Sequence, residues 1–148
     1  MIVALHVATG AAAGSASGSR AAALLIGPLL HLAGDRVPHE DIHSNPIEIG
    51  SGLAALLLLA ARRGIFDPAT LGGAASSAPD LEHVLPFLRP GGRKLFHDRF
   101  GWHRSGGVSV STQLLVAVGI LGVLLFSPRP DRRGGESRDT FRDATTAP

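Results

Sequence analysis

Apolar residues in this chain occur in blocks of helical length, and most of the charged residues lie between the blocks. Five helices are predicted, over residues 3–18, 20–36, 47–62, 68–88 and 107–127. The last segment carries no charge. At about 1.5 Å per residue it covers the roughly 30 Å hydrocarbon layer of a membrane. The pattern predicts an all-α, multi-pass membrane domain of four to five helices over residues 1–127.

Helix-breaking residues set the boundaries of these segments. Pro38 ends the second helix, since the residue before a proline avoids the α region. Asp67 and Pro68 are typical of an N-cap followed by proline at the first helical position. The charged, Gly/Pro-rich tail over 128–148 predicts disorder. The second and third apolar runs are shorter than a full span, so a soluble bundle with one C-terminal anchor remains an alternative.

Composition narrows the functional classes. Cysteine is absent, which excludes disulfides and thiolate metal sites. Basic residues form short clusters beside apolar blocks, such as Arg62-Arg63, and this is typical of membrane-flanking charge. No basic stripe interleaved with aromatic residues is visible, so a nucleic-acid partner is not expected. Gly10, Gly14 and Gly18 recur at four-residue spacing, which predicts close approach of two helix backbones.

If five helices cross a bilayer in alternating directions, most of the histidines and several acidic residues lie on one face of the membrane. That face would receive the start of the first helix, the loop after the second and the loop after the fourth. All seven histidines fall in or near these regions, together with four acids: His6, His31, His39, His43, His83, His97, His103, Asp35, Asp41, Asp80 and Glu82. Imidazole nitrogens with carboxylate oxygens suit Zn²⁺, Mn²⁺ or Fe²⁺, so this convergence predicts a divalent metal site.

Local spacing supports the same site, although each element has a plainer interpretation. His31 and Asp35 are four residues apart and share one helix face, as Asp80 and His83 do at a spacing of three. His31 and Asp35 also suit a simple hydrogen-bonded pair between helices. His6 alone suits a polar residue at a helix end.

Four segments resemble the YdjM-type membrane-bound metal-dependent hydrolases. These are Leu5–Gly14, the HxxxD element His31–Asp35, Ala78–His83 and the paired-histidine segment His97–Ser105. The HxxxD element is also distantly similar to that of zinc-dependent phospholipase C and the S1-type nucleases. In this chain that element precedes the Pro-Asp segment, whereas in the YdjM-type proteins it follows the paired histidines.

The resemblance implies a hydrolase in the bacterial inner membrane, acting on a phosphoester or a lipid at the membrane interface. It implies one or two divalent ions, zinc first, bound among eight ligands: His6, His31, Asp35, His39, Asp80, His83, His97 and His103. Glu82 or Asp41 is then the general base, and Arg99 and Arg104 hold the anionic substrate. The alternative is a non-enzymatic metal-binding or structural membrane protein. A weak excess of basic residues predicts that the histidine-rich face lies outside.

Overall fold

The structure is a computed structural model that describes residues 1–93 and 104–128. Its main helices are α1 (Val3–Ser17), α2 (Arg20–Asp35), α3 (Asn45–Arg63), α4 (Pro68–Ser77) and α6 (Val110–Phe126). Between α4 and α6 lie one short helix, α5 (Leu81–Val84), and three single 3₁₀ turns. These turns are η1 (Ala78–Asp80), η2 (Pro86–Leu88) and η3 (Pro90–Gly92). Apart from isolated bridges from His39 to Ser105 and Val108, the described regular structure is helical, which confirms the all-α prediction.

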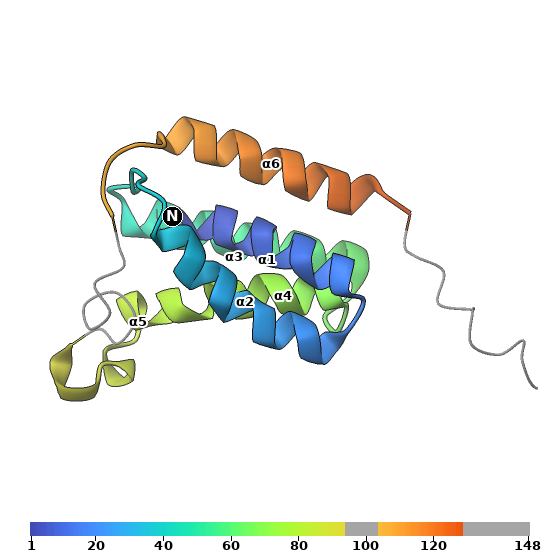
Figure 1. Cartoon of the computed structure of the whole chain (residues 1–148), viewed down its shortest axis with the longest axis horizontal. Helices are drawn as coiled ribbons and strands as arrows, with labels where there is room; N and C mark the ends of the chain where they lie inside the picture. The colour runs from blue at the N-terminus through green and yellow to red at the C-terminus, as the bar shows by residue number, and fades with distance from the viewer. Residues whose placement is uncertain (94–103, 129–148) are drawn as a thin grey trace, which may run out of the picture.

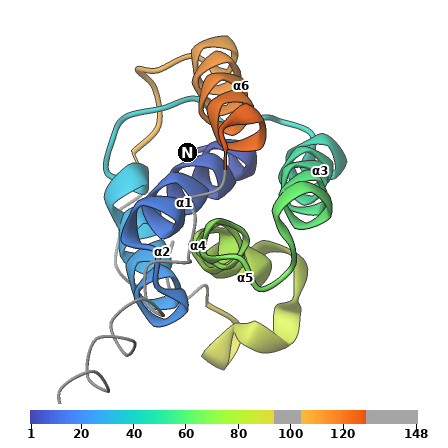
Figure 2. The same ribbon diagram turned by 90° about the vertical axis from the view of Figure 1, so that its right-hand side faces the viewer.

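Helix α1 is the centre of the bundle. Seen end-on, it is surrounded by α2, α4, α3 and α6 (Figure 2). Helix α6 runs along the outer side of α1, and α2 and α4 lie on the opposite side (Figure 1). Two buried apolar clusters, one around Leu5 and Ala117 and the other around Val7 and Leu59, join α1 to α6 and to α3.

Small residues allow α1, α2 and α4 to pack with their backbones in contact. A Cβ atom added at Gly10 would come within 3.0 Å of the Gly72 carbonyl and of Ser76, closer than real Cβ atoms approach. Gly14 meets Pro68 in the same way, and Gly27 meets Ala75. The close approach predicted from glycine spacing is therefore confirmed at Gly10 and Gly14. Gly18 instead ends α1 in the left-handed conformation at φ 62°.

The predicted helix over 68–88 is shorter than expected. Helix α4 ends at Ser77, and Ala78–Asp80 form a 3₁₀ turn before the four-residue α5. Pro79 explains the break, because proline has no N–H to donate to the preceding helical turn. Asp80 therefore lies in the 3₁₀ turn that follows α4 and not in the helix itself.

The last helix also begins later than predicted. Gly106 and Gly107 have φ values of 89° and 95°, which are incompatible with a right-handed helix. Ser109 then caps α6 by accepting a hydrogen bond from the Thr112 N–H at 3.3 Å. Helix α6 consequently has 17 residues.

The prediction of membrane-spanning helices is wrong for the residues described here. Among them, no helix combines the length and the apolar character needed to cross a bilayer. The 17 residues of α6 extend about 26 Å at 1.5 Å per residue, less than the roughly 30 Å hydrocarbon layer. Helix α3 is longer, but it contains Glu48, Arg62 and Arg63. This finding contradicts three predictions: the transmembrane topology, the assignment to the bacterial inner membrane and the outward orientation of the site.

Candidate metal centre

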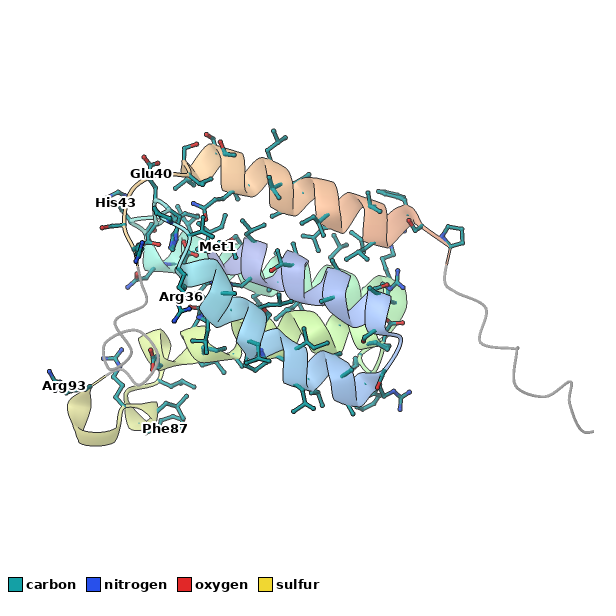
Figure 3. All side chains as sticks on the ribbon, in the orientation of Figure 1. Met1, Arg36, Glu40, His43, Phe87 and Arg93 are labelled. Atoms are coloured by element: carbon teal, nitrogen blue, oxygen red, sulfur yellow. The ribbon has the colours of Figure 1, made fainter. Side chains whose placement is uncertain are left out.

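Three helical segments bring ionisable side chains together at one end of the bundle. His6 lies at the end of the first turn of α1, His31 and Asp35 in the last two turns of α2, and Asp80 at the end of the 3₁₀ turn after α4. The same end holds the labelled residues Met1, Arg36 and Glu40 (Figure 3). The sequence predicted that these segments meet on one face of a bilayer, and the structure brings them together at one end of a helical bundle instead.

The two histidines are the most deeply buried residues of this cluster. The rings of His6 and His31 stack with centroids 3.9 Å apart and an interplanar angle of 25°. Both residues have 0% exposed surface. His6, His31 and Asp80 each offer one ligand atom, and these atoms lie within 4.8 Å of one another. Two imidazoles and a carboxylate at this separation form a suitable ligand set for a divalent cation.

Asp35 connects the two imidazoles from the side. Its Oδ1 lies 3.0 Å from His6 Nε2, and its Oδ2 lies 3.3 Å from His31 Nε2. Oδ1 also accepts a hydrogen bond of 2.7 Å from the Met1 nitrogen. The predicted HxxxD pair is thus formed, and it extends beyond a simple pair because both carboxylate oxygens are used.

A backbone carbonyl fixes the tautomer of His31. His31 Nδ1 lies 2.8 Å from the Ser76 carbonyl oxygen, which can only accept, so Nδ1 carries the proton. The Nε2 atom then faces Asp35 Oδ2 at 3.3 Å and Asp80 Oδ1 at 3.7 Å. Three acceptors that converge in this way repel one another unless a proton or a metal cation lies among them. Donation from Nδ1 to a carbonyl is also the usual support of a metal-binding histidine.

Burial keeps His6 neutral. The pKa of His6 is lowered from 6.5 to about 4, mainly by burial and in part by the nearby His31, while the hydrogen bond that the Asp35 carboxylate accepts acts in the opposite direction. His6 Nδ1 has no hydrogen-bond partner among the described residues. A neutral imidazole is the form that binds metal, so His6 is competent as a ligand at pH 7.

The metal-free protein is expected to lose stability as the pH falls from 6.5 towards 4. Over that range the unfolded chain binds a proton at His6 while the folded chain does not, so the free energy of unfolding decreases with falling pH. The full effect is on the order of 3 kcal/mol. Denaturant titrations across this range should give a shallower pH dependence for His6→Leu. The exposed His43 serves as a control, since His43→Asn should leave the slope unchanged. Equal slopes for His6→Leu and wild type would contradict the assignment.

A hydrogen-bonded loop places His39 and Asp41 beside this cluster. The His39 N–H donates to the Arg104 carbonyl at 3.1 Å, and its own carbonyl accepts from Gly106 at 2.8 Å. The ring is buried, and Nδ1 donates to the Val37 carbonyl at 2.6 Å. His39 Nε2 lies 3.2 Å from Asp41 Oδ1 and contacts the Met1 nitrogen, which links the loop to Asp35.

Two further predicted site residues, Glu82 and Arg104, lie in the described part of the chain. Glu82 is buried, and its carbonyl accepts a hydrogen bond of 2.6 Å from Arg89. Arg104 is exposed, and its backbone contacts Asp35 and His39. The side chain of His83 lies outside the described part of the structure, as do three whole residues: His97, Arg99 and His103.

Two polar residues that sequence reasoning missed hold the start of α1. Glu48 Oε1 accepts a 2.5 Å hydrogen bond from the Val3 N–H, and Gln113 Oε1 accepts one of 3.0 Å from Ile2. Burial raises the pKa of Glu48, and the carboxylates of Asp80 and Asp41 add to that shift. The sequence signal that could have identified Gln113 is its residue type, because it is the one carboxamide in the uncharged segment 107–127.

No family model, no curated protein and no solved structure matches this chain.

Proposed function

We propose that this protein is a metal-dependent hydrolase that cleaves a phosphoester. The observation that carries the proposal is the convergence of His6, His31 and Asp80, whose ligand atoms lie within 4.8 Å of one another. Asp35 adds a second carboxylate in contact with both imidazoles. The similarity of the HxxxD element and of the Pro-Asp segment to the YdjM-type hydrolases supports the same reaction class.

A divalent cation at this site would polarise a phosphoryl oxygen and lower the pKa of a bound water. The chain's own residues supply the remaining requirements. His31 is held by Ser76 with Nε2 directed at the acids, so little reorganisation is needed on binding. The ligand set contains only nitrogen and oxygen donors, which suits Zn²⁺ and Mn²⁺.

Asp41 is the better placed of the two candidate bases. Its side chain is 53% exposed, and its Oδ1 lies 3.2 Å from His39 Nε2. A general base must reach both water and the reacting group. Glu82, at 2% exposed, is withdrawn from solvent. Asp41 is therefore the general base in this proposal.

Chelator-treated protein is expected to hydrolyse phosphoesters only after Zn²⁺ or Mn²⁺ is restored. The panel should contain p-nitrophenyl phosphate, bis(p-nitrophenyl) phosphate and phosphatidylcholine in detergent micelles, which separates monoesters, diesters and lipid substrates. Asp41→Asn should lower turnover by about 10² or more while metal content stays unchanged, since a base contributes 10²–10⁴-fold. Glu82→Gln serves as the matched carboxamide variant. A larger loss in Glu82→Gln than in Asp41→Asn would transfer the role of base to Glu82.

The burial of both histidines also favours a second function, a closed metal site that only stabilises the fold. Structural zinc sites use four ligands and exclude water. With His6 and His31 at 0% exposed and Asp35 at 4%, solvent approaches from the side of Asp80, whose side chain is 16% exposed. Metal-loaded protein that leaves the whole panel uncleaved would establish this structural function in place of hydrolysis.

A further inference from the structure

Gln113 is a buried polar residue on a helix that is otherwise strongly apolar. It lies in the first turn of α6 and is 1% exposed. The only other buried residue of α6 is Ala117, one turn later. A buried carboxamide is costly unless its hydrogen bonds are made, and Gln113 makes them on both ends.

The oxygen of the carboxamide holds the start of α1. Gln113 Oε1 accepts a 3.0 Å hydrogen bond from the Ile2 N–H, immediately before the helix begins. The Ile2 carbonyl in turn accepts from the His6 N–H at 3.2 Å. His6 is therefore one helical turn from the residue that Gln113 holds.

The nitrogen of the same carboxamide holds the loop of His39 and Asp41. Gln113 Nε2 donates to the Glu40 carbonyl at 2.8 Å and to the Val108 carbonyl at 3.1 Å. Glu40 lies between His39 and Asp41 in the chain. The carboxamide oxygen faces an N–H group, and the carboxamide NH₂ faces two carbonyl oxygens. A flipped amide would lose all three hydrogen bonds, so only one orientation is possible.

We propose that Gln113 is a positioning residue that fixes the distance between His6 and the His39–Asp41 loop. The inference rests on the proposed function, because it concerns the geometry of the same site. The carboxamide is planar and short, so its two ends set the separation of α1 from the loop. The hydrogen bond from Val3 to Glu48 fixes the next residue of α1, and the start of this helix is thus clamped from both α6 and α3.

Titration with Co²⁺ as the metal probe tests this role in the full-length chain, since the visible spectrum reports coordination geometry as well as affinity. Gln113→Met keeps the side-chain length but loses both hydrogen-bonding ends, and it should weaken Co²⁺ binding by about 10-fold or more and shift the absorption bands. Gln113→Glu keeps an acceptor for Ile2 but places an oxygen against two carbonyls, and it should give a similar loss. If Gln113→Met does not fold, Gln113→Glu carries the comparison.

Leu124→Ala is the matched control for a purely structural effect. Leu124 packs from the far end of α6 against the cluster of Val7 and Leu59, so its truncation should lower stability without touching the site. We expect unchanged Co²⁺ affinity and spectrum in this variant. Unchanged affinity and spectrum in the Gln113 variants, with a wild type that binds Co²⁺, would overturn the positioning role alone. A wild type that binds no Co²⁺ would overturn the proposed function as well.

Discussion

Replacing Asp35 with alanine is expected to weaken metal binding by about 100-fold and to lower the thermal midpoint by roughly 10 °C. Asp35 is 4% exposed, and its two oxygens contact His6, His31 and the Met1 nitrogen. Removal of one partner from a buried charged network costs about 3–5 kcal/mol, and each kcal/mol moves the midpoint of a chain of this size by about 2–4 °C. Calorimetry with and without Zn²⁺ measures both effects.

Asp67→Ala is the matched control at the opposite end of the bundle. Asp67 caps α4 by accepting from the Ala69 N–H at 2.9 Å, and it pairs with Arg63 at 3.3 Å. Its loss should cost about 1–2 kcal/mol, as for other N-caps, and leave metal affinity unchanged. If Asp35→Ala behaved like Asp67→Ala, losing stability but no metal affinity, Asp35 would be a structural residue only.

Gly10→Val is expected to destabilise the fold by about 3 kcal/mol or more, at the upper end of overpacking in a protein core. A Cβ at this position would clash with the Gly72 carbonyl and with Ser76, and the carbonyl belongs to the backbone and cannot rotate away. Denaturant unfolding monitored by circular dichroism measures the change.

Gly119→Ala is the control for glycine replacement in a helix. Gly119 lies in α6, and an added Cβ there would meet nothing within 4 Å. This variant should be neutral or gain up to about 1 kcal/mol from helix propensity. Wild-type stability in Gly10→Val would show that α1 and α4 do not pack in the manner described.

Part of the fold and of the site could be predicted because the signals were local. The cap of α4 at Asp67 follows from residue type, since aspartate followed by proline is typical of a helix start. The HxxxD pair follows from helical periodicity, which places His31 and Asp35 on one face. The convergence of the segments that carry His6, His31 and Asp80 follows from connecting consecutive helices up and down.

The remaining features depend on tertiary contacts. The length and lack of charge of the segment 107–127 predict a membrane span. In the structure two glycines with positive φ precede the helix, which begins only at Val110. The role of Gln113 depends on α6 lying beside α1, which no local pattern encodes. The resemblance to YdjM-type hydrolases remains a prediction, and so does the disordered tail, which, apart from Pro128, lies outside the described residues.

X-ray absorption at the zinc edge of the Zn²⁺-loaded protein tests the central claim most directly. The site of His6, His31 and Asp80 predicts one tightly held zinc per chain, with nitrogen and oxygen ligands only, at about 2.0–2.2 Å. Two imidazoles should contribute to the outer-shell scattering, and His31→Ala should reduce this contribution to one. A zinc shell without imidazole scattering, or a chain that retains no zinc after gel filtration, would contradict the account.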